Sequence, residues 1–497
     1  MSISEPIVEP ISATRDAPAP PTPSPRFNAP LAVDLDGTLV ACDTLDESLA
    51  AALIRRPFAT LMALLRGLFG GRAALKAALA RLAVIDVDTL PYRADLIAYL
   101  HEQRQEGREI CLATAADQSI AVRVAGVVGV FGHVYASDGR RNLKGRVKAE
   151  LLAAEFPDGF SYAGDSRTDL AVWRRAASAI AVSSAPMARR VARVTTLERH
   201  VEARRGGWRA WVAAARPHQW TKNALVFAPV MLGWKLIVPG RIVDVVLVAA
   251  MFCVLSSLTY FINDIADLSA DRRHATKRRR PFAAGSVPVR HGLTAATLGI
   301  PLVLAAAWAI SPPVSLCLLG YCGLTFAYSA GLKRAPILDC MIIGGLFTLR
   351  LVTGVLAAQL GWSAWFLTFG FSFFCSLALA KRHAELVVHA DGECFVPGRG
   401  YRYQDSSLTL ALGAAASTTS IIILLLYLMW EAFPEGAYRR PEFLWAAPVL
   451  LFAWIGRIWL IANRGEMHDD PVVFALRDKV SLAIGTCVAA AFLIAVI

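Results

Sequence analysis

Three aspartates in one short stretch of the chain have the spacing of a metal site. Residues 263–285 read NDIADLSADRRHATKRRRPFAAG and directly follow a long apolar run. Asp264, Asp267 and Asp271 stand at i, i+3 and i+7, so a helix would place their carboxylates on one face. Carboxylates on one face repel one another unless a cation lies between them, and Mg²⁺ typically bridges a few carboxylates to substrate phosphates. The stretch therefore predicts a Mg²⁺ site for a phosphorylated substrate.

A group of basic residues follows these aspartates and can hold the remaining phosphate charge. It consists of Arg272, Arg273, Lys277, Arg278, Arg279 and Arg280. A charged cytoplasmic loop that obeys the positive-inside rule would also carry such arginines, but it would not need the spaced aspartates. At a membrane surface, the stretch predicts a site where a phosphorylated donor is used on a lipid.

Two aspartates nearer the N-terminus are spaced for phosphate chemistry. In LAVDLDGTL, an apolar strand-like run ends in Asp34 and Asp36. Successive strand residues face opposite ways, so these two carboxylates share a side. One can attack a phosphorus atom while the other moves a proton. A second strand-like run, EICLATA, carries Thr114, whose hydroxyl can bind a phosphate.

A lysine and two more aspartates would complete this second site. Lys144, in GRRNLKGRVK, can supply a cation to the phosphate or to the nucleophile. Lys148 is the competing candidate, and a solvated loop lysine is the alternative for Lys144. Asp165 and Asp169, in YAGDSRTDL, follow another strand-like run and can hold Mg²⁺.

The elements that must position these residues fall into two parts. The chain of 497 residues is 56% hydrophobic, and its apolar excess lies almost entirely after about residue 222. From 31 to 200, five short strand-like runs alternate with helical stretches, which predicts a parallel α/β domain. The runs are LAVDLD, EICLATA, GVFGHVYAS, FSYAGDS and SAIAVS. A helical insertion between the first two strands, at about 45–105, predicts a cap. Its run RRPFATLMALLRGLFGG favours a helix packed on its own domain, with a helix on a membrane surface as the alternative.

Long apolar runs beyond residue 222 predict an all-α polytopic membrane domain. Each run is long enough, or nearly so, to cross a bilayer as a helix. The runs lie near 223–238, 242–263, 292–311, 314–330, 337–359, 363–381, 408–429, 442–462 and 480–497. The predicted fold is therefore an N-terminal α/β domain followed by about nine transmembrane helices.

Lysine and arginine are distributed unevenly between the predicted loops. The loops rich in both are 264–291, 331–336, 382–407 and 463–479. The opposite loops carry Arg241, Arg439 and Arg440. By the positive-inside rule, the N-terminal domain and both candidate sites are expected on the cytoplasmic side of a bacterial-type inner membrane. The net charge of +12 fits loops that face anionic lipid, and no nucleic-acid partner is expected.

The predicted domain boundaries follow these changes in composition. A Pro- and Ala-rich lead at 1–29 has no apolar core of a signal peptide and is expected to be disordered. The α/β domain is assigned to 30–200, a linker to 201–222 and the membrane domain to 223–497. Nine cysteines are scattered without a CxxC pair, so reduced thiols are expected.

Further candidates lie at the ends of predicted spans. They are Lys222, Tyr328, Lys333, Arg334 and Asp339. Arg350 lies about three helical turns inside a span. An arginine at that depth is costly unless it is paired, which makes it a functional candidate. Asp339 is too far along the helix to be its direct partner.

The four N-terminal pieces, in this order, resemble the haloacid dehalogenase-like (HAD) phosphatase superfamily over about residues 30–190. The resemblance implies a Rossmann-like domain with a helical cap. It implies that Asp34 is the nucleophile, that Asp36 is the general acid/base, and that Thr114 and Lys144 bind the phosphate. The Mg²⁺ ligands that it implies are Asp34, Asp165, the backbone of Asp36 and, in support, Asp169.

The membrane part resembles the UbiA prenyltransferase superfamily over about residues 210–497. Its strings NDxxDxxxDxxxxxKxxRPxAAG and YSxxLKxxxxxD resemble the decaprenyl-phosphate phosphoribosyltransferase branch. In that branch the donor is phosphoribosyl pyrophosphate and the acceptor is a polyprenyl phosphate. The more usual members take a prenyl diphosphate donor and an aromatic acceptor, and they carry a fuller second Asp-rich motif. Here Ile343 occupies the position four residues after Asp339.

The second resemblance also implies a role for each membrane candidate. Asp264 and Asp267 would hold Mg²⁺ against the leaving pyrophosphate, and Asp271 would complete or orient that shell. Asp339 would face the reacting carbon or a second metal. The residues expected to bind substrate are Lys222, Asn263, Lys277, Arg280, Tyr328, Lys333, Arg334 and Arg350.

Three functions are compatible with these patterns. The preferred one is a membrane transferase that moves a phosphoribosyl group to a polyprenyl phosphate and carries a fused HAD phosphatase. The alternative is a prenyltransferase with a prenyl diphosphate donor and an aromatic or quinone-precursor acceptor. The third is a membrane scaffold with a HAD-like binding module, against which the complete set of acidic and lysine residues argues. The isoprenoid length, the phosphatase substrate and the oligomeric state stay open.

Overall fold

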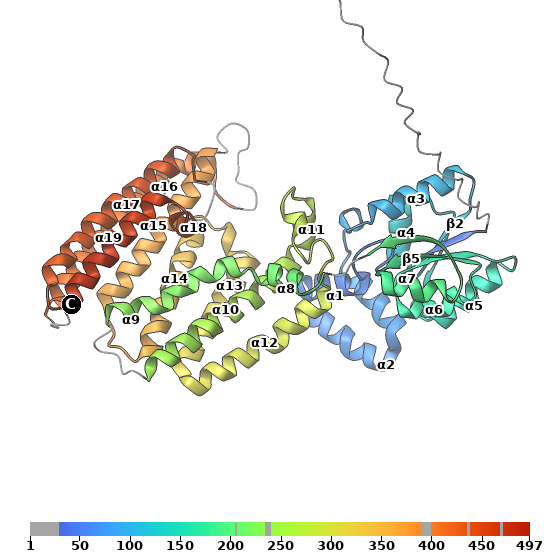
Figure 1. The fold of residues 1–497 in the computed structure, drawn as a ribbon, viewed down its shortest axis with the longest axis horizontal. Coiled ribbons are helices and arrows are strands. Elements are labelled where there is room, and N and C mark those ends of the chain that lie inside the picture. The colour runs from blue at the N-terminus through green and yellow to red at the C-terminus, as the bar shows by residue number, and fades with distance from the viewer. Residues whose placement is uncertain (1–28, 204–205, 234–239, 389–398, 435–437, 468–470) are drawn as a thin grey trace, which may run out of the picture.

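The computed structural model contains an α/β region followed by a helical region (Figure 1). It describes residues 29–203, 206–233, 240–388, 399–434, 438–467 and 471–497. The predicted disordered lead, apart from its last residue, lies outside the described residues.

Six parallel strands form the sheet of the α/β region, in the order β3-β2-β1-β4-β5-β6. They are β1 (Leu31–Val33), β2 (Ile110–Asp117), β3 (His133–Ser137), β4 (Ser161–Gly164), β5 (Ser178–Ser183) and β6 (Thr196–Glu202). The first five lie in the strand-like runs of the sequence, so the predicted parallel α/β architecture is confirmed. Because β1 lies between β2 and β4, the residues that follow these three strands meet at one edge of the sheet.

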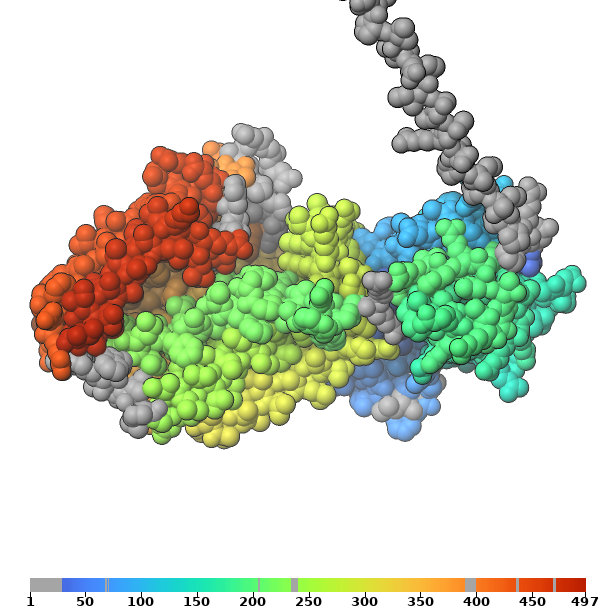
Figure 2. Space-filling model, viewed as in Figure 1, coloured from blue at the N-terminus to red at the C-terminus, as the bar shows by residue number. Residues whose placement is uncertain are grey.

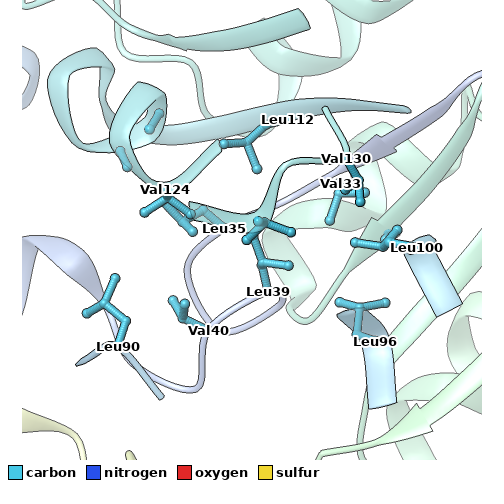
Figure 3. Packing of buried hydrophobic residues seen from close by; sticks show 14 of the residues in the cluster. Val33, Leu35, Leu39, Val40, Leu90, Leu96, Leu100, Leu112, Val124 and Val130 are labelled. Carbon is cyan, nitrogen blue, oxygen red and sulfur yellow. The ribbon is translucent and has the colours of Figure 1, made fainter. Parts of the chain in front are cut away.

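Apolar side chains cover both faces of the sheet. On one face, Val33 and Leu112 pack with Leu100 of α3 (Ala94–Gln105) and Val124 of α4 (Gln118–Val128) (Figure 3). The opposite face carries a cluster that includes Trp173. Its helices are α5 (Arg146–Glu155), α6 (Leu170–Trp173) and α7 (Ala185–Ala192). Burial on both faces explains the nearly continuous apolar runs of the central strands.

The predicted insertion between β1 and β2 is helical. It contains α1 (Thr44–Arg55), α2 (Pro57–Leu82), the short turn η1 (Val87–Thr89) and α3. Asp43 caps α1 by accepting a hydrogen bond from the Leu45 amide at 2.9 Å. Helix α2 is broken into two limbs at Gly71, whose φ of 78° suits a residue without a Cβ.

The helical region contains eight helices, among the described residues, that are long and apolar enough to cross a membrane. They are built on α10 (Arg241–Ala266), α12 (Val289–Ile310), α13 (Pro312–Ala330), α14 (Leu338–Ala358), α15 (Ala364–Val388), α16 (Ser406–Tyr427), α17 (Ala446–Asn463) and α19 (Lys479–Val496). Short elements join them: α11 (Leu268–Arg273), η5 (Lys277–Arg279), η6 (Leu332–Arg334) and α18 (Pro471–Ala475).

The segment predicted as the first span, 223–238, is not one long helix in its described part. Its residues belong to a 3-10 helix, η3 (Pro217–Phe227), and to the five-residue helix α9 (Ala228–Leu232). Pro229 lacks an amide hydrogen and can start a helix but cannot continue one from η3. The described part of the chain therefore gives eight candidate spans instead of about nine.

The α/β region docks on the helical region through α1, and the two parts touch along a broad front (Figure 2). Ala50 of α1 shares an apolar cluster with Phe282 and Val289. Glu47 accepts two hydrogen bonds from the Arg272 guanidinium, at 2.6 and 3.2 Å, and both side chains are 6% exposed. This buried ion pair connects the insertion directly to the Asp-rich stretch.

Arg272→Ala is expected to destabilise the folded protein by about 3–5 kcal/mol, because it leaves the Glu47 carboxylate buried without its partner. Arg273→Ala is the matched control. Arg273 also pairs across the interface, with Asp86, but its side chain is 69% exposed, so about 0–1 kcal/mol is expected. Thermal unfolding of both variants in detergent checks the difference. Equal shifts of the unfolding temperature would contradict the buried contact.

Candidate active sites

Three carboxylates meet where β1 and β4 end. Asp34 follows β1, Asp165 follows β4, and Asp169 ends the turn η2 (Arg167–Asp169). One oxygen of each lies within 4.8 Å of the others. Burial raises the pKa of Asp34 above its usual range, the Lys148 charge lowers it, and the Asp169 charge raises it further. A hard cation such as Mg²⁺ fits this group of oxygen ligands.

Asp36 is held apart from that trio by its own contacts. Its Oδ1 accepts a hydrogen bond from the Thr44 amide at 2.8 Å. Burial, followed by the charge of Asp43, raises the pKa of Asp36 well above its usual range. A carboxyl group in this state carries a proton near neutral pH and can donate it to a leaving group. Gly37 must be glycine, because a Cβ there would lie 2.5 Å from the Asp165 carboxylate.

Lys148, and not Lys144, contacts the first aspartate. The Lys148 Nζ donates to Asp34 Oδ1 and to the Tyr162 hydroxyl, both at 2.8 Å, and its side chain is 2% exposed. Lys144 lies exposed in the loop before α5. The geometry therefore differs from the preferred assignment. Lys148 lies in the first turn of a helix that packs on the sheet, whereas Lys144 precedes that helix.

The end of β2 adds a hydroxyl and an unpredicted lysine. Thr114 is fully buried, and its Oγ1 accepts a hydrogen bond from the Ala116 amide at 3.0 Å. Lys76 reaches the same strand end from the second limb of α2, where its Nζ donates to the Ala115 carbonyl at 2.5 Å and to Asn142 Oδ1 at 3.2 Å. Lys76 is the single charged residue in the apolar run AALKAALA, and this isolated charge is the sequence signal that could have identified it.

In the helical region, the Asp-rich stretch is neutralised by arginines. Asp264, at the end of α10, pairs with Arg216 and lies 3.1 Å from Arg280. Asp271, in α11, pairs with the same Arg280 nitrogen at 2.7 Å. Both carboxylates are 3% exposed. These two share a side, with a guanidinium between them, but the single helix predicted to carry all three aspartates is interrupted at Asp267, between α10 and α11. Arg216 was not predicted as a site residue, because its place at the entry to the first predicted span suits a simple interface anchor; it lies 48 residues from Asp264 along the chain.

The other candidates of this stretch lie further out. The Asp267 side chain is 50% exposed and has Lys333 Nζ at 4.0 Å. Asn263 is partly buried, and Lys277 and Arg334 are exposed. The contact between Asp267 and Lys333 brings the loop after α13 against the Asp-rich stretch. The structure thus gathers these loops at one end of the bundle.

A second cluster surrounds Asp339 at the start of α14. This fully buried carboxylate accepts a hydrogen bond from the Tyr401 hydroxyl at 2.6 Å. Arg382 lies at 3.1 Å and Arg399 at 3.7 Å from its other oxygen. Arg399 also donates to the Tyr328 hydroxyl. Arg382, Arg399 and Tyr401 were not predicted as site residues, because they come from α15 and the segment after it, far along the sequence.

A pocket opens beside this second cluster. Its polar side is formed by Lys381, Arg382 and Arg399 together with Tyr328. The remaining wall is apolar, with Ile343, Phe347, Phe374, Leu377, Ala378, Pro471 and Val472. The rings of Phe347 and Phe374 are stacked at 4.6 Å. The pocket is therefore lined by both cationic and apolar side chains.

Arg350 lies behind the Phe347 wall and is satisfied by neutral groups. Its Nε donates to Asn223 Oδ1 at 2.9 Å, and one terminal nitrogen donates to the Leu346 carbonyl at 2.6 Å. Its guanidinium lies 5.5 Å from the Phe347 ring centre. Lys222 approaches the same ring at 5.7 Å. Both predicted cations thus contact the aromatic wall of the pocket.

Comparison with known proteins places the helical region in a family. Residues 224–480 match the UbiA prenyltransferase family. The chain is 40% identical over 476 residues to the Sinorhizobium fredii protein named "Uncharacterized protein y4nM", covering 94% of this chain and 91% of that protein. It is 31% identical over 276 residues to the decaprenyl-phosphate phosphoribosyltransferase of Mycobacterium tuberculosis, covering 54% of this chain and 88% of the relative.

One solved structure is similar over part of the chain. It is a UbiA homologue from Archaeoglobus fulgidus bound to DMAPP and Mg²⁺, with 16% sequence identity and a TM-score of 0.44. The match covers 57% of this chain and 97% of that one. The family match rests on residues 224–480, which contain most of the eight apolar helices. The chain is an integral membrane protein that belongs to the UbiA prenyltransferase family.

Proposed function

We propose that the helical domain transfers a phosphoribosyl group from phosphoribosyl pyrophosphate to a polyprenyl phosphate. In this reaction the bond between ribose C1 and the pyrophosphate oxygen breaks. An oxygen of the acceptor phosphate forms the new bond to C1, and pyrophosphate leaves. The 31% identity to a decaprenyl-phosphate phosphoribosyltransferase supports this choice within the family.

The observation that carries the proposal is the charge around the second cluster. Lys381, Arg382 and Arg399 line the pocket, whereas the acidic residues beside them are Asp339 and Glu385. Cations placed in a membrane domain are costly unless they bind something anionic. A polyprenyl phosphate presents an anionic head and an apolar tail, which suit the cationic and the apolar residues of the lining.

The Asp-rich stretch suits the donor. Arg216 and Arg280 already lie at the carboxylates, and a guanidinium can bind two phosphate oxygens at once. Asp264 and Asp267 would hold Mg²⁺, which supplies charge neutralisation for the leaving pyrophosphate. Arg280 and Lys333 would bind the phosphate oxygens as that charge develops. Lys277 and Arg334, which are exposed at the same end, would extend this cationic surface.

The purified protein in nanodiscs tests the choice of donor and acceptor. With Mg²⁺, phosphoribosyl pyrophosphate and a polyprenyl phosphate, we expect a lipid-linked ribose phosphate and an equal amount of pyrophosphate. A parallel reaction contains a prenyl diphosphate and an aromatic acid. A product in the parallel reaction alone would establish the alternative, an aromatic prenyltransferase, and would overturn the proposal.

Arg399→Gln is expected to raise the KM for polyprenyl phosphate about 10- to 100-fold, because one charge-assisted contact to the acceptor phosphate is lost. The KM for the ribosyl donor should stay nearly unchanged. Arg402→Gln is the matched control, since Arg402 is exposed three residues further along and does not line the pocket. An equal rise for both substrates in the Arg399 variant would contradict an acceptor site at this cluster.

For the N-terminal domain we propose a HAD-type phosphatase at about residues 30–200. Asp34 would attack phosphorus while the ester oxygen leaves with a proton from Asp36, and water would then release phosphate from the Asp34 carboxyl group. Lys148 and Thr114 would bind the phosphate, and Asp34, Asp165 and Asp169 would hold Mg²⁺, whose charge would neutralise the phosphate oxygens. The closeness of these carboxylates and the raised pKa of Asp36 support this assignment. The proposed substrate of this domain is a phosphate ester on the lipid product, because both domains belong to one polypeptide.

We also propose that both sites face the cytoplasm. The basic loops 264–291 and 331–336 support this orientation through the positive-inside rule. Cysteine labelling at exposed Val127→Cys with a membrane-impermeant maleimide, on spheroplasts and on inverted vesicles, tests it. Labelling of intact spheroplasts would place the domain on the outside and would overturn the assignment.

A further inference from the structure

The first limb of α2 turns its large apolar side chains outward. Phe58, Leu61, Met62, Leu65 and Phe69 are exposed by 86%, 55%, 53%, 48% and 94%. Their spacing of 3, 1, 3 and 4 residues places all five on one side of a helix. Such a continuous exposed stripe on a folded domain marks an interaction surface.

The opposite side of this limb faces its own domain with small residues. Thr60 is fully buried and Ala63 is 8% exposed. A Cβ on Gly67 would lie 3.0 Å from the Leu75 side chain of the second limb, so the two limbs approach closely there. The limb is therefore oriented opposite to an ordinary surface helix, which buries its large apolar residues and exposes its polar ones.

The charge of the helix is uniformly basic. From residue 55 to 82 the chain contains no Asp or Glu. Its basic residues are Arg55, Arg56, Arg66, Arg72, Lys76 and Arg81. Arg66 is exposed beside the apolar stripe, where a long side chain can extend to a phosphate group. An apolar face with basic residues and no acidic ones is the pattern of helices that lie on anionic bilayers.

The helix also starts close to the membrane-embedded part of the chain. Helix α1, which leads into α2, contacts α10 and α12. Figure 1 shows α2 continuing from α1 just beyond the end of α12. Ala50 of α1 and Ala214 of α8 (Trp208–Ala215) belong to one apolar cluster. Trp208 of α8 is 71% exposed at this junction, and tryptophan is enriched where proteins meet the bilayer surface.

We propose that the first limb of α2 lies in the headgroup region of an anionic bilayer, with Phe58, Leu65 and Phe69 inserted among the lipids. The bilayer is the one that already holds the helical domain. A second copy of this chain is a less suitable occupant, because two such faces would bring like charges together. Binding of this limb to the bilayer would hold the insertion next to the lipid. Lys76, which the insertion places at the end of β2, would then also be held close to the membrane.

Spin labels on the full-length protein in nanodiscs test this placement. Single cysteines are introduced as Phe58→Cys, Leu65→Cys or Phe69→Cys in a Cys487→Ser background, and the signal of the background protein is subtracted. Val127→Cys, on an exposed face of α4, is the matched control. In discs that contain phosphatidylglycerol, we expect the three stripe labels to be relaxed by oxygen and shielded from a nickel chelate. The control label should show the reverse.

Three results would overturn the proposal. The first is nickel accessibility of the stripe labels equal to that of the Val127 label. The second is dipolar broadening that appears only in discs with two protein copies, which would assign the face to a second chain. The third is unchanged shielding of the stripe labels in discs of phosphatidylcholine alone, which would show that the helix does not require an anionic lipid. The test needs neither reaction, so its failure is separate from failure of the proposed activities.

Discussion

Asp34→Asn is expected to reduce the release of phosphate from p-nitrophenyl phosphate by about a thousandfold or more. An amide cannot attack phosphorus as a carboxylate does, so the covalent route is lost. Asparagine has nearly the same shape and can still accept the hydrogen bond from Lys148, but it leaves that buried lysine without its counter-ion. Thermal unfolding of the same sample therefore separates a lost nucleophile from a lost fold. Release of nitrophenol by the purified protein with Mg²⁺ is the measurement.

Two controls make this result specific to the proposed nucleophile. Lys144→Ala should retain most of the phosphatase activity, because Lys144 is exposed, whereas Lys148→Ala should lose much of it. Lipid-linked transfer by the Asp34 variant should be unchanged. Activity near the wild-type level in the Asp34 variant would show that another group attacks. A wild type without any phosphate release would favour the scaffold interpretation of this domain.

The choice between the two lysines shows where sequence reasoning stopped. Lys144 and Lys148 are separated by four residues, about one helical turn, and both follow a strand-like run. The deciding fact is that α5 begins at Arg146, so Lys148 is carried by the helix into the sheet edge and Lys144 stays in the loop. In that position Lys148 contacts Tyr162 of β4 and Asp34, which follows β1. Such a contact is tertiary, and spacing along the chain does not contain it.

The arrangement of strands and helices was easier to predict from the sequence than the side-chain contacts. The four central strands, β1, β2, β4 and β5, were predicted because a central parallel strand, covered on both faces, must be nearly all apolar. The edge strand β3 was predicted from its largely apolar run GVFGHVYAS. The edge strand β6 was missed because its sequence TLERHVE mixes charged and apolar residues. One of those charged residues, Glu198, forms an ion pair with Arg108 at 2.5 Å in the interior of the domain, where both side chains are almost fully buried. A charge pattern alone could not distinguish that strand from a solvated loop.

The insertion shows the limit of amphipathic periodicity. The sequence interpretation favoured packing of its apolar residues on the domain, yet Phe58 and Phe69 are exposed while Thr60 is buried. Periodicity identifies an apolar side of a helix, but it does not say which neighbour covers that side. The same holds for Asp339. Its arginine partners lie 43 and 60 residues away, on α15 and in the segment after it, and tertiary packing brings them to α14.

Asp264→Asn is expected to reduce lipid-linked transfer by about a hundred- to a thousandfold and to leave phosphatase activity unchanged. The variant removes the buried carboxylate that pairs with Arg216 and Arg280, together with a proposed Mg²⁺ ligand. Arg216 would then lose its anionic partner before the donor binds. The expected measurement is pyrophosphate release in nanodiscs, with thermal unfolding of the same samples to separate a lost site from a lost fold.

Asp244→Asn is the matched control for this variant, because it removes an aspartate from the same helix. Asp244 pairs with Arg241 at 2.8 Å in the first turn of α10, at the far end from Asp264. Twenty residues of helix separate the two positions by about 30 Å. Transfer by the Asp244 variant should stay near the wild-type rate. Equal losses of transfer activity in both variants would mean that the substitutions only destabilise α10. That result would contradict a role of the Asp-rich stretch in the reaction. A selective loss, with rescue by Asp264→Glu, would show that the negative charge at this point is what the transfer requires.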